Sequence, residues 1–89
     1  MVRETRLLPS YPNPFNPVTT IVYRLSEQQQ VSLTVFDAAG RRIATLVDSE
    51  QEAGQYTLPF DASGLASGIY FVRFSAGDVM STQKLTLIK

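Results

Sequence analysis

Carboxylates and hydroxyls are the side chains of this sequence that could do chemistry, because it contains no cysteine and no histidine. A pair of carboxylates can act as general acid and general base, and Asp37, Asp61 and Asp78 are the candidates. All three lie in short stretches rich in glycine, serine or alanine. Aspartate is common in such turns because its side chain bonds local backbone. We therefore predict structural roles for these acids.

No activated nucleophile is recognisable either. Ser63 and Ser67 lack a histidine to deprotonate them, and the only lysines are Lys84 and Lys89. No phosphate-binding glycine loop or nucleophile elbow occurs. We predict that the module is not an enzyme and has no cofactor.

Metal binding is not favoured by the residue types present. Without thiolates and imidazoles the usual zinc and copper ligands are missing. The stretch 48–54, DSEQEAG, has three acids but lacks the pattern of a calcium loop. We interpret it as a polar loop and predict no metal.

Charge and hydropathy limit the partners and the domain organisation. Eight basic and eight acidic residues cancel, so the net charge gives no reason to expect nucleic acid or an anionic membrane as partner. No run of about 18 apolar residues occurs, and the first ten residues lack an apolar signal core. Met1 is followed almost directly by sequence typical of a folded domain, which suggests a fragment of a longer protein. We expect one domain over residues 1–89, with a linker and first strand in 1–10 and a sandwich in 11–89.

Apolar residues alternate with polar ones along most of the chain, which is typical of half-buried strands. The alternation predicts strands at 20–25, 31–36, 42–47, 55–60, 69–74 and 79–88, with a leading strand near 6–9. Seven short antiparallel strands separated by turns predict an all-β, immunoglobulin-like (fibronectin III-like) β-sandwich.

Local signals predict the strand order. The turn DAAGR at 37–41 makes the third and fourth strands a hairpin, so both belong to one sheet. Pro59 cannot donate to a ladder, which indicates an edge strand or a bulge for the fifth strand. We expect one sheet of the first, second and fifth strands and another in the order fourth, third, sixth, seventh. Tyr70, at the start of the sixth strand, has the spacing of a tyrosine corner.

The stretch YPNPFNP, residues 11–17, is too rich in proline for a helix or a central strand and too apolar for a solvated linker. We expect an ordered crossing from one sheet to the other. Phe15 is expected to plug the end of the sandwich, and Asn13 and Asn16 to bond turn backbone.

Exposed aromatic rings raise carbohydrate binding as an alternative function. Tyr11, Phe15, Phe36 and Phe71 are the candidates for exposure. The sequence has no tryptophan, and packing is the favoured role of these rings. Polysaccharide is therefore the less favoured partner.

Four blocks in order carry a resemblance to a known family: YPNPFNPVTTIVYRL, VSLTVFDAAGRRIATLV, AGQYTLPFDASGLASGIYFVRF and KLTLIK. The sequence resembles the C-terminal sorting domains of type IX secretion, the type A family, over residues 11–89. These domains are similar to the immunoglobulin-like domain of the flagellar hook-capping protein.

The resemblance implies a non-catalytic module at the end of a larger secreted protein, such as a glycoside hydrolase, peptidase or adhesin. It implies passage through the periplasm and across the outer membrane of Bacteroidetes-type bacteria by the secretion and attachment machinery. At the cell surface the domain is then either cleaved off during attachment or kept as a cell-anchoring module. The recognition positions that it implies are Pro12, Asn13, Pro14, Phe15, Asn16, Pro17, Lys84 and Lys89. The structural positions are Asp37, Gly40, Gly54, Asp61, Gly64, Leu65, Gly68 and Tyr70. Beside this reading stand two alternatives, a carbohydrate-binding module and a structural spacer.

Overall fold

The computed structural model describes residues 4–89, which form seven β-strands and no helix. The strands are β1 (Arg6–Leu7), β2 (Val18–Leu25), β3 (Gln29–Asp37), β4 (Arg42–Gln51), β5 (Gly54–Asp61), β6 (Gly68–Ala76) and β7 (Val79–Leu87). The all-β class and the predicted strands are confirmed. Residues 1–3 of the predicted linker lie outside the described residues. Within residues 4–89 no helix is long and apolar enough to cross a membrane.

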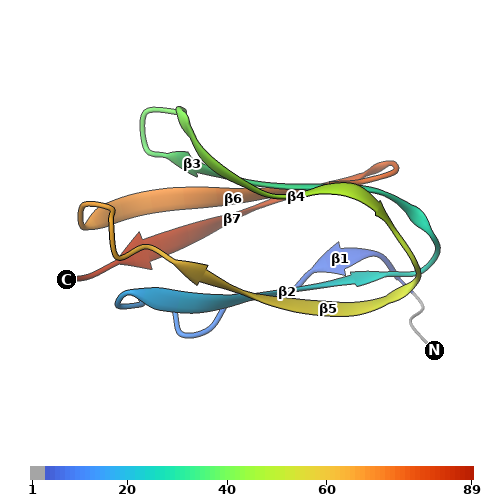
Figure 1. The fold of residues 1–89 in the computed structure, drawn as a ribbon, viewed down its shortest axis with the longest axis horizontal. Helices are drawn as coiled ribbons and strands as arrows, with labels where there is room; N and C mark the ends of the chain where they lie inside the picture. The colour runs from blue at the N-terminus through green and yellow to red at the C-terminus, as the bar shows by residue number, and fades with distance from the viewer. Residues whose placement is uncertain (1–3) are drawn as a thin grey trace.

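Two antiparallel sheets face each other, as Figure 1 shows. The three-stranded sheet has the order β1-β2-β5 and the four-stranded sheet the order β4-β3-β6-β7. This is the predicted topology, and the strand that contains Pro59 lies at the edge of its sheet. At an edge, a residue without an N–H can face solvent on its unpaired side, so the ladder is not broken.

The core lies between the sheets and is built by the alternating residues. Ile21, Tyr23 and Leu25 of β2 face Val31, Leu33 and Val35 of β3, and all six are buried. Tyr23 connects the layers: its ring stacks on Tyr56 with centroids 5.2 Å apart and lies 5.2 Å from Phe74 of the opposite sheet. Its hydroxyl donates to the side-chain oxygen of Gln51. Burial raises the pKa of the Tyr23 phenol.

The region 48–54 differs from the prediction of a polar loop. β4 continues to Gln51 and β5 starts at Gly54, so only Glu52 and Ala53 connect them. Ser32 lies opposite Asp48 and Gln30 opposite Glu50 in the ladder. Backbone pairing with β3 extends the strand although its side chains here are polar and show no apolar alternation. Polar side chains suit this end of the hairpin because solvent reaches them.

β4 is also irregular where it pairs with β3. The register shifts between Leu33 and Thr34 and again between Val35 and Phe36. Such irregularities bend an edge strand and make it a poorer template for another chain. The outer edge of the four-stranded sheet is thus protected at β4 by its geometry.

Candidate functional site

The proline-rich segment 11–17 leaves β1 and returns to β2, which are neighbours in the same sheet. The expected crossing between sheets is therefore wrong as a path of the chain. The segment nevertheless joins the two sheets, because it bonds to β7 of the four-stranded sheet. The peptide bonds before Pro12, Pro14 and Pro17 are cis.

Asn13 and Phe15 pair with the outer edge of β7. Asn13 Nδ2 donates to the Lys84 carbonyl at 2.8 Å, and Asn13 Oδ1 accepts from the Thr86 N–H at 3.0 Å. The Phe15 N–H donates to the Thr86 carbonyl at 2.9 Å and its carbonyl accepts from the Ile88 N–H at 3.0 Å. Phe15 forms a parallel bridge with Leu87. The segment therefore occupies the place of an additional strand beside β7.

The Phe15 side chain fills the end of the core. It is only 2% exposed, and its ring lies 6.3 Å from the Phe60 ring between centroids. The prediction that Phe15 plugs the end of the sandwich is confirmed, and Phe15 is wrong as a candidate for an exposed aromatic ring. Tyr11, in contrast, is 59% exposed.

The other side of the segment is fixed to the three-stranded sheet. Tyr11 and Thr20 exchange two backbone hydrogen bonds, at 3.1 and 2.8 Å. The buried hydroxyl of Thr19 donates to the Pro12 carbonyl at 2.8 Å, and the Ala62 N–H donates to the Pro17 carbonyl at 2.8 Å. We call residues 11–17 with their partners on β2 and β7 the clasp.

Two amide side chains, those of Asn13 and Gln83, show where sequence reasoning failed. Asn13 was expected to bond turn backbone, but its partners are 71 and 73 residues away. Asn16 is exposed. Gln83, which the sequence analysis did not select, donates to the Leu8 carbonyl and accepts from the Ser10 N–H, both at 2.9 Å. The Gln83 side chain thus extends the clasp, and its inward position on β7 was the available signal.

The turn 37–41 is organised by the Asp37 carboxylate. Its Oδ1 accepts from the N–H groups of Ala39 and Arg41 at 3.0 and 2.9 Å, and its Oδ2 from Arg41 Nε at 2.8 Å. Gly40 has φ of 87°, which favours glycine. Bonding by the Arg41 backbone and then by its guanidinium lowers the pKa of Asp37.

This pKa shift predicts a contribution to acid stability. Because the folded pKa lies below the unfolded value, the ionised carboxylate stabilises the fold at higher pH. That contribution is lost as the pH falls from about 4 through the folded pKa. We expect the Tm of D37N to fall less between about pH 5 and pH 2 than the Tm of the parent chain. Parallel Tm curves would contradict the assignment; Asp61, whose pKa is lowered by bonding to Ser63, is the same in both chains.

The loop between β5 and β6 is fixed by short local bonds. Asp61 accepts from the Ser63 N–H at 2.9 Å, and the Leu65 N–H donates to the Ala62 carbonyl at 2.9 Å. The Tyr70 hydroxyl donates to the Ala66 carbonyl at 2.6 Å, which confirms the tyrosine corner.

Removing only this hydroxyl should be measurable. We expect Tyr70→Phe to lower the free energy of unfolding by about 1 kcal/mol and Tm by about 4–8 °C, because the Ala66 carbonyl loses its partner. Thermal unfolding followed by circular dichroism measures this. Tyr11→Phe, at an exposed ring, is the control, and an equal loss in both variants would argue against the corner.

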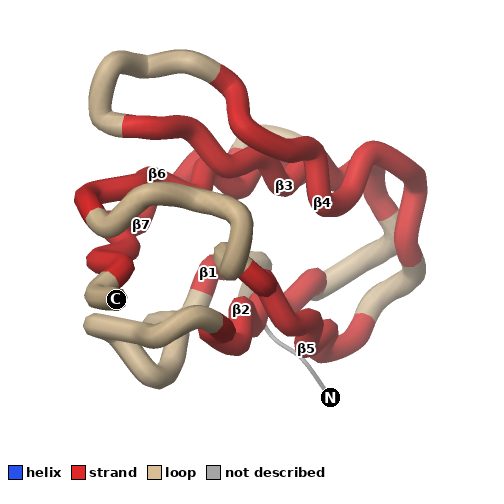
Figure 2. Tube along the Cα trace, turned by 60° about the vertical axis from the view of Figure 1, so that its left-hand side comes forward, coloured by secondary structure: helices blue, strands red, loops and turns tan. Residues whose placement is uncertain are grey.

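The positions implied by the resemblance gather at one end of the sandwich. Asp37 pairs with Tyr70, Gly68 with Leu87, and Leu87 with Phe15. In Figure 2 the clasp and the loops after β3 and β5 lie at the end that carries the C-terminus. Gly54 is the exception, since it pairs with Leu25 at the opposite end. A Cβ atom added at Gly64 would contact no other residue, and nothing in the structure explains a glycine there.

The two lysines have different neighbours. Lys84 is exposed and lies opposite Phe71 in the ladder. Lys89 Nζ donates to the Ser63 carbonyl at 2.8 Å, and its N–H to Ser67 Oγ at 3.1 Å. Lys89 therefore connects the end of the chain to the loop between β5 and β6.

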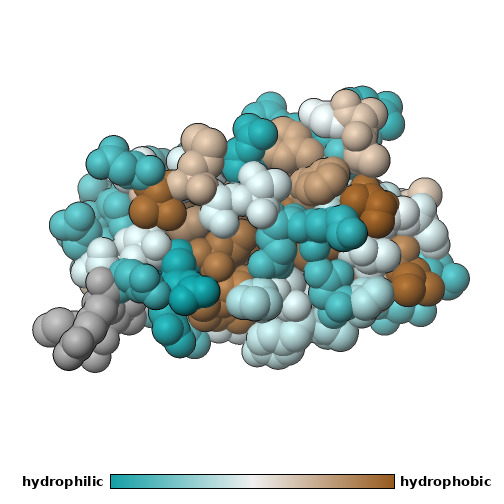
Figure 3. Space-filling view, turned by 180° about the vertical axis from the view of Figure 1, so that it is seen from behind, coloured by the Kyte–Doolittle hydropathy of each residue, from teal (hydrophilic) through white to brown (hydrophobic). Residues whose placement is uncertain are grey.

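Apolar side chains do not gather into one continuous patch on the side shown in Figure 3, where they alternate with hydrophilic ones. The large hydrophobic residues exposed over residues 4–89 are Tyr11, Val18, Ile43, Met80 and Ile88.

A comparison with family models gives one match, described as a secretion system C-terminal sorting domain, over residues 10–89. Neither the curated proteins nor the solved structures give a significant match.

Proposed function

The chain belongs to the family of type IX secretion C-terminal sorting domains, and from this premise we propose that it carries a covalently linked upstream protein to the cell surface and holds it there. Membership makes it a non-catalytic module that acts with the type IX machinery in export. The proposal adds the upstream cargo, a glycoside hydrolase or peptidase, passage through the periplasm and outer membrane, and attachment.

The observation that carries the proposal is the separation of the two ends of the domain. Arg6 of β1 pairs with Arg24 near the Gly54 end, whereas the clasp lies at the other end with the last residues of β7. A cargo joined before residue 4 therefore leaves the clasp free for a receptor. We propose the recognition role for the clasp and for Lys84 and Lys89.

Fusion to a reporter tests the function. A periplasm-directed reporter followed by residues 1–89 is expected to reach the surface of a bacterium that has type IX secretion, while the reporter alone stays in the periplasm. Protease accessibility on intact cells measures delivery. Retention of the full fusion in the periplasm would contradict export, and release into the medium would contradict attachment.

An unrelated β-sandwich of equal size in the same fusion is the matched control. It separates a sorting module from a spacer, because a spacer requires only size and solubility. Surface delivery of that control would refute the proposed function.

A further inference from the structure

The outer face of the four-stranded sheet carries two aromatic rings side by side. Phe36 of β3 lies opposite Phe71 of β6 in the ladder, and both rings are half-buried. They line a shallow hollow of about 290 Å³ together with Arg73, Thr82 and the turn at Asp37. No residue of the clasp lines this hollow.

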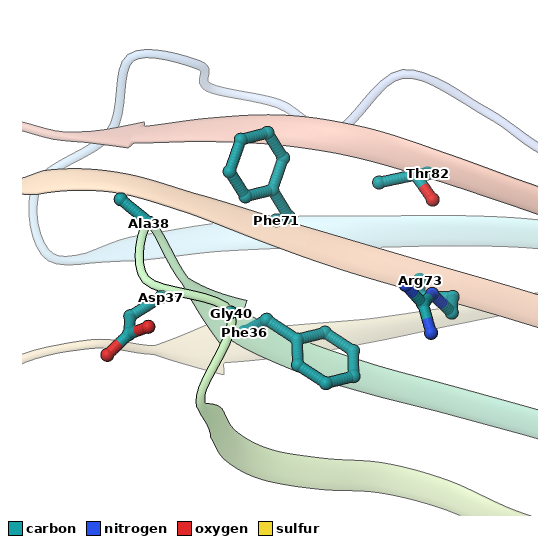
Figure 4. Close-up of a pocket in the computed structure, with 7 residues that line it drawn as sticks. All are labelled: Phe36, Asp37, Ala38, Gly40, Phe71, Arg73 and Thr82. Carbon is teal, nitrogen blue, oxygen red and sulfur yellow. The ribbon is translucent and has the colours of Figure 1, made fainter.

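Cations surround these rings. The Arg73 guanidinium lies over the Phe36 ring, 4.9 Å from its centroid, and in Figure 4 the Asp37 carboxylate points away from both rings. Lys84 lies opposite Phe71, and Arg42 opposite Phe36. Pairing thus forms a row across all four strands, which consists of Arg42, Phe36, Phe71 and Lys84.

None of these cations is neutralised within the part of the chain that the structure describes. The ion pairs over residues 4–89 are Arg6 with Glu4 and Arg41 with Asp37. Arg42, Arg73 and Lys84 are in neither. Asp37, an acid that lines the hollow, already accepts three hydrogen bonds from its own turn.

Apart from Asp37, the acids of this sheet and its turns lie towards its other end. Asp48 is opposite Ser32, Glu50 is opposite Gln30, and Asp78 lies in the turn after β6. The zero net charge of the sequence therefore conceals a separation of charge along the sheet. A protein surface with a basic, aromatic region of this kind attracts an acidic partner and orients it.

We propose that this face, centred on Phe71, Arg73 and Lys84, is the docking surface for an acidic protein surface of the type IX machinery; the inference rests on the proposed function. An apolar side chain of the partner enters the hollow and carboxylates pair with the cations. Arg42 and Lys84 are three strand spacings apart, about 14 Å, which exceeds one sugar ring and suits a protein segment. The contact with Phe36 holds Arg73 in place before binding, which reduces the entropic cost.

Charge reversal in the reporter fusion tests the surface. We expect R73E combined with K84E to reduce surface delivery about tenfold or more, because two central attractive pairs become repulsive. R24E, on the three-stranded sheet, is the matched control and should deliver normally. Circular dichroism must show that all variants fold. If R73E/K84E does not fold, K84E alone is tested, because Lys84 is exposed. Normal delivery by folded R73E/K84E would overturn the docking surface, whereas surface delivery of the reporter without the domain would overturn the proposed function.

Binding to defined probes identifies the class of partner. We expect the peptide acetyl-Glu-Asp-Phe-Asp-Glu-amide to shift the amide resonances of Phe71, Arg73 and Lys84, less at high salt and not in R73E. Shifts caused by polygalacturonate and not by the peptide would overturn a protein partner in favour of a glycan. Sedimentation showing a dimer that R73E abolishes would instead identify a second copy as the occupant.

Discussion

Phe15→Ala is expected to lower the free energy of unfolding by about 3–5 kcal/mol and Tm by about 15 °C or more. The ring is 2% exposed and packs against Phe60 at the end of the core. Alanine leaves a cavity there, because the backbone of the segment stays fixed by its bonds to Thr86 and Ile88. Urea unfolding followed by circular dichroism gives the free energy.

Tyr11→Ala is the matched control for this prediction, since it removes a ring of similar size from the same segment. The Tyr11 ring is 59% exposed, and its removal should cost less than about 0.5 kcal/mol. Equal losses in the two variants would show that the segment is not anchored by Phe15. In the reporter fusion we expect Phe15→Ala to lose surface delivery at temperatures where it is unfolded.

The second large effect is expected for Tyr23→Ala, again about 3–5 kcal/mol. Its ring contacts Tyr56 of its own sheet and Phe74 of the other, so truncation removes packing in both layers. Denaturant unfolding with tyrosine fluorescence and circular dichroism as two probes measures the loss. Coincident transitions would confirm that the two sheets unfold together.

Tyr23→Phe separates the hydroxyl from the ring. It removes only the bond to Gln51, which is expected to cost about 1 kcal/mol. A loss as large as that of Tyr23→Ala would mean that the polar link to β4 dominates over packing. A smaller loss supports the ring as the main connection between the layers.

The strands and their order could be predicted from the sequence because the sandwich buries one face of each strand. Ile21, Tyr23 and Leu25 alternate with more polar neighbours, and the core uses that period. Pro59 indicated that β5 is an edge strand, and the turn at Asp37 indicated that β3 and β4 form a hairpin. The continuation of β4 to Gln51 was missed because backbone pairing there needs no apolar residue.

Contacts between distant residues had no local signal. Asn13 in a proline-rich segment looks like a turn former, and nothing near it indicates that its amide reaches β7. The cations around Phe71 could not be recognised either, because a sum of charges does not show which residues the register brings together. The family could be recognised because the blocks of the sequence keep their order.

The clasp makes the completed fold depend on residues that are synthesised far apart in time. Asn13 and Phe15 leave the ribosome more than 70 residues before their partners Lys84, Thr86 and Ile88. During translation the segment has no edge to pair with, and the end of the core stays open. A chain interrupted before residue 84 cannot close the clasp, so a closed clasp shows that β7 has been synthesised.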